Sequence, residues 1–412
     1  MKNLLLLIIT AFVSLPAGAQ NNGSVVVGTI DSIQSKVLNE QRKIWVYLPQ
    51  GKQNPSGNRY PVIYLLDGTF HFLSVAGMVQ QFSQVNGNTL CPEMIVVGIV
   101  NTDRTRDLTP THVAADPPYM DSTFSKTSGG GEQFLSFVEK ELIPYIDSHY
   151  PTQPYRMLIG HSFGGLMAIH SMMYHTRLFN AYISIDPSMW WEDMSYLKRT
   201  KEMLQQKKFT GVSLYLAYAH TLDEGMDAQK AENDTSRMTR HFRAIRSIDR
   251  AFQNKKDSGL RYGSKYYSSE THTTVPLIAE HDALRFIFSR YQFKSSTTDY
   301  TDPDVDIAGK YENHFNEVSQ FLGYRVSPAE NFVQGWAAEF FRIKQYAKAG
   351  KLYALTVKYY PESVDAHQSM GDFYVATGDR TRAIDSYQKA LALKERPEIR
   401  SKLNELKKAG SK

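Results

Sequence analysis

The chain has 412 residues, of which 42% are hydrophobic, a formal net charge of +5, and a single cysteine, Cys91. This length and apolar content predict one large domain and a smaller one, both stabilised by core burial, because one cysteine cannot form an intramolecular disulfide. The positive charge is modest and forms no aromatic-interleaved basic patch, so neither nucleic acid nor anionic lipid is expected as a partner.

Residues 1–19 have the pattern of a secretory signal peptide. Lys2 precedes an apolar run, Leu4 to Val13, and Ala17 and Ala19 provide the small side chains that a signal peptidase needs. This run is too short to cross a bilayer, and no later run is long and apolar enough to do so. We therefore expect a mature chain without a membrane span that is periplasmic or secreted.

Residues 25–292 alternate strand-like and helix-like segments, which is typical of a sheet covered by helices on both faces. The first two predicted strands are antiparallel neighbours, and several later ones are short apolar runs that should be buried. A helix is predicted from Glu132 to Asp147 because its apolar residues recur with helical spacing. In chain order, the predicted strands are 25–33, 42–48, 62–66, 94–100, 155–159, 181–185, 212–218 and 265–268.

A polar segment rich in Pro, Asp, Ser and Gly lies between Asp107 and Gly131, and it includes Tyr119, Met120 and Phe124. Long irregular segments in compact domains are usually functional or mobile. We therefore predict that this segment forms a loop over the active site.

The segment Gly160-His161-Ser162-Phe163-Gly164-Gly165 has the spacing of a nucleophile elbow. It follows the predicted strand 155–159 and precedes an apolar helical run. Glycines allow a sharp turn from strand to helix, so the serine hydroxyl stands over the helix N-terminus, where backbone N–H groups can stabilise an oxyanion. Ser162 is therefore the candidate nucleophile, and a glycine-rich structural turn is the alternative.

A serine nucleophile needs a histidine that takes its proton, and His272 is best placed for this role. It lies between the predicted strand 265–268 and a helical run from Leu277 to Phe288, where the last loop of a hydrolase sheet is expected. Solvent-facing or structural roles are expected for three other downstream histidines, near a strand end or in helical patterns: His220, His241 and His281.

The acid that orients the histidine should follow the predicted strand 212–218, because in α/β-hydrolases the chain order is serine, acid, histidine. Glu224 is the first candidate and Asp223 the second, whereas Asp227 lies too far into the next helix. If all three are solvated loop charges, Ser162 and His272 would work as a dyad.

A stretch rich in Ser, Thr and Asp breaks the apolar pattern after the hydrolase-like region, and we predict a linker over residues 293–310. Residues 311–412 then follow the tetratricopeptide pattern of paired helices. The clearer unit comprises Ala366–Tyr374 and Ala383–Leu391, and a weaker one precedes it. Two repeats are too few to be stable alone, so this small all-α domain should pack on the catalytic domain.

Three further motifs carry a family resemblance. They are Val62-Ile63-Tyr64-Leu65-Leu66-Asp67-Gly68, the segment Asn101–Pro110, and Asp186-Pro187-Ser188-Met189-Trp190-Trp191. Together with the elbow they resemble the esterase D-like family of α/β-hydrolases, which includes ferric-enterobactin, bacillibactin, feruloyl and acetyl-xylan esterases and the mycolyltransferases. The resemblance implies an α/β-hydrolase sandwich, and secreted members with a tetratricopeptide-like tail resemble proteins of Bacteroidetes-type bacteria.

The resemblance also implies roles for individual residues. Ser162 would be the nucleophile and His272 the base. The oxyanion hole would be formed by the backbone N–H of Phe163 and by an N–H from the loop at Gly68, most simply that of Thr69. The family's commoner form has one carboxylate after a glycine-rich turn, whereas here Asp223 and Glu224 are adjacent, so the acid stays open.

Arg104, Trp190 and Trp191 lie near predicted strand ends and are candidate substrate-binding residues. For Arg104, an ion pair with Asp107 that holds a loop is the stronger interpretation. One tryptophan is expected at the floor of an acyl pocket and the other in the core. The sequence contains no His-Glu-x-x-His, Cys-x-x-Cys or acidic calcium-loop motif, so no metal or other cofactor is expected.

The sequence therefore predicts a secreted serine esterase that acts through an acyl-enzyme on a siderophore-type or polysaccharide-linked ester. An acyltransferase of the mycolyltransferase type would use the same elbow and differ only in acceptor access. A binding protein whose repeat tail recruits a protein partner is the third hypothesis. The intact Ser162 and His272 argue against that hypothesis, and a panel of ester substrates would separate all three.

Overall fold

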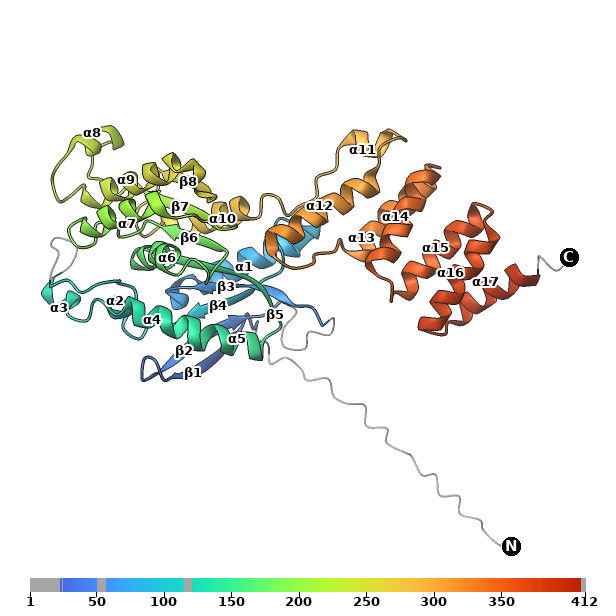
Figure 1. The fold of residues 1–412 in the computed structure, drawn as a ribbon, viewed down its shortest axis with the longest axis horizontal. Coiled ribbons are helices and arrows are strands. Elements are labelled where there is room, and N and C mark those ends of the chain that lie inside the picture. Colours follow the sequence, from blue (N-terminus) through green and yellow to red (C-terminus); the bar gives the residue numbers. More distant parts are fainter. Residues whose placement is uncertain (1–22, 24, 50–56, 115–120, 409–412) are drawn as a thin grey trace, which may run out of the picture.

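The computed structural model describes residues 23, 25–49, 57–114 and 121–408, which are drawn in colour in Figure 1. The predicted signal peptide and the positions of Tyr119 and Met120 lie outside these residues, as does the side chain of Phe124. Within the described residues, no helix is both long and apolar enough to cross a membrane.

A mixed eight-stranded sheet forms the centre of the larger domain, in the order β1-β2-β4-β3-β5-β6-β7-β8 (Figure 1). β2 is antiparallel to both β1 and β4, and the other neighbouring strands are parallel. Every predicted strand overlaps an observed one, so the expected α/β alternation is confirmed. The strands are β1 Thr29–Ser35, β2 Glu40–Tyr47, β3 Tyr60–Leu65, β4 Ile95–Ile99, β5 Thr152–His161, β6 Ala181–Ile185, β7 Ser213–Ala219 and β8 Arg261–Tyr267.

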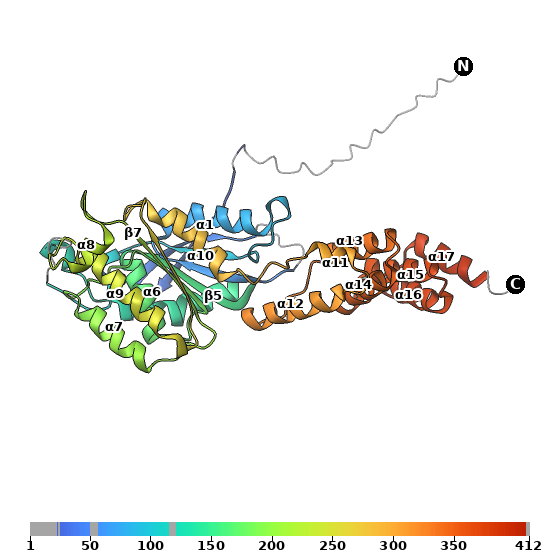
Figure 2. The ribbon, with the colours of Figure 1, turned by 90° about the horizontal axis from the view of Figure 1, so that it is seen from above.

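Both faces of the sheet are buried under helices, and successive strand residues therefore belong to different cores. In β3, Val62 and Tyr64 join one hydrophobic cluster, whereas Ile63 and Leu65 join the other. Figure 2 shows α1 and α10 on one face and α6, α7 and α9 on the other. The longer helices of this domain are α1 Gly68–Ser83, α4 Gly131–Phe137, α5 Ile143–His149, α6 Phe163–Tyr174, α7 Ser195–Gln206, α9 Arg240–Asn254 and α10 Val275–Ile287.

Shorter helical segments fill the connections between these elements. A π-helical turn, Val138–Leu142, divides the single helix predicted from Glu132 to Asp147 into α4 and α5. The short α-helices are α2 Arg104–Asp107, α3 Ser122–Ser125 and α8 Ala228–Asn233, and 3₁₀ turns lie at Val85–Gly87 and Lys256–Ser258.

The C-terminal tail consists of helices that pack in neighbouring pairs, α13 with α14 and α15 with α16, and extends away from the sheet (Figure 1). The packing within the second pair is close, because a Cβ atom added at Gly371 would lie 2.5 Å from the Tyr387 ring. The helices are α11 Thr297–Thr301, α12 Ile307–Leu322, α13 Glu330–Arg342, α14 Tyr346–Tyr359, α15 Val364–Ala376, α16 Arg380–Leu393 and α17 Pro397–Lys408.

The segment predicted as a linker, residues 293–310, is not a plain linker. It contains α11, whose first turn is closed by a capping box between Ser296 and Asp299, and the start of α12. Ser296 and Asp299, two of the polar residues on which the linker prediction rested, form this capping box. α12 then joins the two parts of the molecule, because Val318 lies in a core cluster of the larger domain and Tyr311 in that of the tail.

Candidate active site

The turn between β5 and α6 has a strained backbone at Ser162. Its φ and ψ angles are 60° and −115°, outside the regions that L-residues normally occupy. The turn is so tight that a Cβ atom added at Gly160 would lie 2.2 Å from the carbonyl oxygen of Gly164. The Ser162 N–H donates to the Ile185 carbonyl oxygen at 2.9 Å, which ties the turn to the end of β6. The backbone therefore has the form expected of a nucleophile elbow.

The two expected oxyanion donors lie at helix N-termini, where the first N–H groups have no partner within the helix. Phe163 is the first residue of α6, and Thr69 is the second residue of α1. The two helix starts abut, because a Cβ atom added at Gly164 would lie 3.3 Å from Asp67 Oδ2. At Gly68 an added Cβ atom would lie 2.5 Å from the carbonyl carbon of Gly98, so only glycine fits this close approach to β4.

His272 lies in the turn after β8, and its Nδ1 donates a hydrogen bond to Asp186 Oδ2 at 2.5 Å. Asp186 follows β6 directly and is fully buried, whereas 37% of the His272 side chain is exposed. The His272 ring also packs against the ring of His161, the neighbour of Ser162, with centroids 4.5 Å apart. The serine, the carboxylate and the histidine thus follow the ends of β5, β6 and β8, parallel strands that end at the same edge of the sheet.

The carboxylate that contacts His272 corrects the prediction of Glu224 or Asp223. Both of those residues lie in an exposed turn after β7. The end of β7 is instead covered by Asp186, whose N–H donates to the Ala217 carbonyl oxygen and whose Oδ1 accepts the Ala219 N–H at 3.0 Å. The place above β7 where the acid was expected is therefore occupied by a side chain from the neighbouring strand.

A second histidine contacts the same carboxylate. His241 on α9 is buried, and its Nε2 lies 3.0 Å from Asp186 Oδ2, the oxygen that His272 also contacts. Burial by itself would raise the pKa of the Asp186 carboxyl, but the charge and hydrogen bonds of His241 and His272 lower it below its usual range. Asp186 is therefore an ionised acceptor at neutral pH.

Sequence reasoning missed Asp186 and assigned His241 an ordinary helical role. One signal for Asp186 was available, because it directly follows a predicted buried strand at the sheet edge that carries Ser162. No local pattern distinguishes His241 from other helical histidines, since its contact depends on how α9 packs over the sheet.

Arg104 forms an ion pair, but not with Asp107 as predicted. Its Nε and Nη2 donate to the two carboxylate oxygens of Asp67 at 2.7 and 2.9 Å. Asp67 is buried just before α1, and burial alone would raise the pKa of its carboxyl. The hydrogen bonds and charge of Arg104 outweigh burial and lower that pKa. Arg104 thus braces the N-cap of α1, the helix whose second residue is Thr69.

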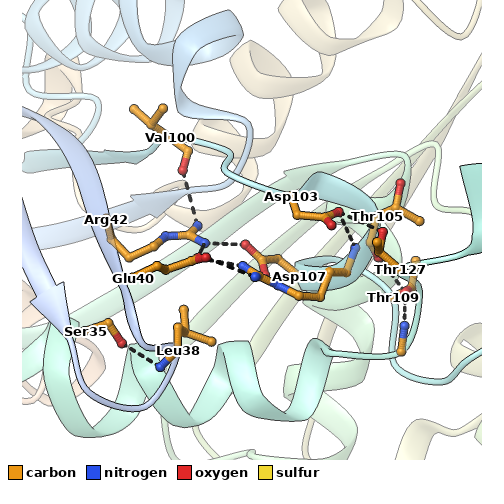
Figure 3. Close-up of polar contacts among 12 residues, drawn as sticks. Ser35, Leu38, Glu40, Arg42, Val100, Asp103, Thr105, Asp107, Thr109 and Thr127 are labelled. Carbon is orange, nitrogen blue, oxygen red and sulfur yellow. Dashed lines mark hydrogen bonds and ion pairs between the residues drawn. The ribbon is translucent and has the colours of Figure 1, made fainter.

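Asp107 has different partners, which Figure 3 shows. Its Oδ2 accepts from Arg42 Nη1 at 2.5 Å, and its Oδ1 accepts from Arg106 Nε at 2.7 Å. Arg42 also donates to Glu40 and to the Val100 carbonyl oxygen. This network fixes the segment after β4 to the β1–β2 hairpin, so Asp107 acts in the scaffold beneath the site.

Both tryptophans predicted near the site are buried, with 4% of Trp190 and none of Trp191 exposed. Trp191 Nε1 donates to Thr111 Oγ1 at 3.0 Å, and its ring meets the Phe163 ring edge to face at 5.4 Å. Trp190 packs against Phe163 from 6.1 Å. The tryptophans therefore support the first residue of α6 from below, and an acyl-pocket role for either remains a prediction.

A family model described as "Putative esterase" matches residues 35–272. The matched segment covers more than half of the chain and runs from β1 to His272. The chain belongs to this esterase family. Membership of this family supports ester hydrolysis, the reaction suggested by the nucleophile elbow and by the contact between Asp186 and His272.

Curated relatives include proteins named as siderophore esterases. The ferri-bacillibactin esterase BesA of Bacillus subtilis is 29% identical over 286 residues, which covers 65% of this chain and 92% of that protein. The siderophore triacetylfusarinine C esterase of Aspergillus fumigatus is 25% identical over 256 residues, covering 57% and 84%. These relatives support carboxylic ester hydrolysis by this chain.

Two solved structures resemble larger parts of the molecule. An IroE-like serine hydrolase from Shewanella oneidensis has a TM-score of 0.67 and 29% identity, and the match covers 81% of this chain and 99% of that one. An uncharacterised protein from Capnocytophaga ochracea has a TM-score of 0.63 and 21% identity, covering 92% and 99%. The similarity to the Capnocytophaga ochracea protein concerns the fold alone. Because this match covers 92% of the present chain, it includes much of the helical tail.

Proposed function

We propose that this protein is a serine carboxylic ester hydrolase that works through an acyl-enzyme, with Ser162 as nucleophile, His272 as base and Asp186 as the orienting acid. The observation that carries the proposal is the 2.5 Å hydrogen bond from His272 Nδ1 to the buried Asp186. This bond fixes the histidine tautomer that leaves Nε2 as a proton acceptor, which a serine nucleophile requires.

In the acylation step, Ser162 Oγ attacks the ester carbonyl carbon while its proton passes to His272 Nε2. The N–H groups of Phe163 and Thr69 would stabilise the oxyanion that forms. The tetrahedral intermediate then breaks its bond to the alcohol oxygen, and His272 returns the proton to that leaving group. Asp186 stabilises the imidazolium and keeps its own charge throughout.

Deacylation repeats this sequence with water as the nucleophile. His272 Nε2 takes a proton from the water while the water oxygen attacks the acyl carbon. A second oxyanion then forms beside the same two N–H groups. When the bond to Ser162 Oγ breaks, the serine recovers its proton and the free acid leaves. The same two N–H donors serve both steps, so the site needs no rearrangement between them.

The proposed substrate is a siderophore-type ester, and the mature chain is proposed to be exported. The names of the relatives support the substrate class. The predicted signal peptide supports export, and the paired helices of the tail support the proposed tetratricopeptide-like domain. Faster hydrolysis of acetylated xylan or methyl ferulate would instead favour a polysaccharide-linked ester as the substrate.

The test is a hydrolysis panel on the purified mature chain. It should include aryl acetates and butyrates, methyl ferulate, acetylated xylan and a cyclic catecholate triester. We expect turnover of aryl esters and the highest kcat/KM for the catecholate triester. Ser162→Ala should lower kcat by about 10⁵-fold or more with an unchanged fold, as loss of the nucleophile does in serine hydrolases. Retention of a tenth of the wild-type rate would refute the mechanism.

A further inference from the structure

Three side chains of the types that bind transition metals converge beside the nucleophile. One ligand atom each from Asp186, His241 and His272 lies within 4.8 Å of the other two. The proposed hydrolysis uses the contact between Asp186 and His272, but it does not require a second histidine on the same carboxylate oxygen. His241 therefore raises the question of what else this cluster binds.

The cluster has the chemistry and nearly the spacing of a zinc site. Zn²⁺ binds imidazole nitrogen and carboxylate oxygen at about 2.0–2.2 Å in tetrahedral geometry, which places ligand atoms roughly 3.3 Å apart. His272 Nδ1 and His241 Nε2 now lie 2.5 and 3.0 Å from Asp186 Oδ2. An ion would need these atoms to separate by less than about 1 Å.

The surroundings allow that adjustment. Asp186 is held through its other oxygen, Oδ1, by the Ala219 N–H, which leaves Oδ2 for an ion. His272 lies in a turn and is partly exposed, so it can shift and gives solvent access to the cluster. A water molecule entering from that side would supply the fourth ligand of a catalytic-type zinc site.

The local charge also suits a cation. Asp186 supplies a buried negative charge that contacts both histidines of the cluster. Arg104 is paired with Asp67, and His71 contacts Glu280 at 3.0 Å. The buried carboxylate of Asp186 is thus the charge that would attract a cation to this cluster.

We propose that Asp186, His241 and His272 bind a divalent transition-metal ion, best fitted by Zn²⁺, and that the bound ion switches the esterase off. An ion on His272 Nδ1 requires the lone pair there, so the ring proton must reside on Nε2. In that tautomer Nε2 only donates and cannot accept the proton of Ser162. The inhibitory role rests on the proposed function, whereas binding of the ion does not.

Binding is tested first in the full-length mature Ser162→Ala chain, so that no catalysis is needed. We expect calorimetric titration to show one tight Zn²⁺ per chain, and Co²⁺ to give the strong visible absorption of a tetrahedral site. Adding His241→Gln should weaken binding by at least about tenfold. An absence of Zn²⁺ binding, or equal binding with and without His241→Gln, would overturn the site.

Inhibition is tested with wild type, His241→Gln and His175→Gln, each compared with its own metal-free rate. Zn²⁺ should inhibit wild type, and EDTA should restore the rate. The concentration for half inhibition should rise at least about tenfold in His241→Gln. His175→Gln is the matched control, because it removes a different histidine that contacts a carboxylate, Glu132, on the surface. The His175→Gln variant should have the same metal-free rate as wild type and should be inhibited by the same concentration of Zn²⁺.

Inhibition that is equal in wild type and His241→Gln, or that disappears in His175→Gln, would overturn the switch. The proposed hydrolysis and the proposed metal site can be refuted independently of each other. Hydrolysis that survives in Ser162→Ala would refute the proposed function, whereas Zn²⁺ binding that depends on His241 in that same chain would still support the metal site.

Discussion

The carboxyl edge of the sheet and the helical tail are built in different ways. Asp67, Ser162 and Asp186, at the sheet edge, all have positive φ angles, and two of them are buried carboxylates. In the described tail, Lys344 is the one non-glycine residue with a positive φ angle, and side chains such as Ser363 and Asp379 cap its helices. The edge therefore contains strained backbone at three non-glycine residues close to the proposed catalytic groups, whereas the tail is held mainly by helix packing and capping.

The largest effect is expected when the carboxylate of Asp186 is removed from the sheet edge. Asp186→Asn should lower kcat by about 10⁴-fold, as loss of the triad acid does elsewhere, because an amide at this position favours the wrong tautomer of His272. Glu224→Gln and Asp223→Asn are matched controls from the exposed turn after β7 and should leave kcat unchanged. A large loss in either control with an active Asp186→Asn would restore the original assignment.

The difference between the two regions also explains what the sequence could predict. The strands, the elbow and the tail helices depend on patterns within about 20 residues, such as apolar spacing, capping and glycine turns, and these were found. Which carboxylate contacts His272 depends on which strand end lies over β7. Which carboxylate pairs with Arg104 depends on how α1 packs against β4. The contact of His241 and the Asp67–Arg104 pair join residues far apart in the chain, so no local pattern reveals them. For Asp186 the available signal was its place directly after a predicted buried strand.

A second prediction compares charge in the scaffold with charge in the tail. Arg42 and Asp107 are each 1% exposed, and Arg42→Met would leave Asp107 with one cationic partner. The free energy of unfolding in urea should fall by about 3 kcal/mol. Arg382→Met removes an exposed pair with Asp379 in the tail and should change stability by less than about 0.5 kcal/mol. Equal effects would contradict the comparison.

The pH dependence of stability gives a smaller effect. Asp67 has a pKa below its unfolded value, so its contact with Arg104 stabilises the fold above the unfolded pKa and is lost as pH falls through the folded one. Asp67→Asn should cost about 2 kcal/mol at pH 7 and progressively less below about pH 4. Asp385→Asn, which removes an exposed tail pair with Lys389, should have little effect at pH 7. A constant Asp67→Asn deficit between pH 7 and pH 3.5 would contradict the electrostatic role.

The smallest effect on catalysis is expected from removal of the tail. Truncation after Gly323 keeps α12, whose Val318 and Leu322 pack in a core cluster of the larger domain. Turnover of a small aryl ester should be unchanged, because the contacts described at and beneath the site come from residues between Glu40 and Glu280. The melting temperature of the larger domain should also be retained. A soluble truncated chain with unchanged melting but no turnover would show that the tail contributes to the site.

The most direct test of the central claim measures the reactivity of Ser162 itself. A fluorophosphonate probe should label the wild-type chain at a single residue, identified as Ser162 by mass spectrometry of its peptides. We predict that Asp186→Asn slows this labelling by orders of magnitude while Glu224→Gln labels at the wild-type rate, because only Asp186 holds the His272 tautomer that activates the serine. Labelling at another residue, or fast labelling in Asp186→Asn with slow labelling in Glu224→Gln, would contradict the proposed triad.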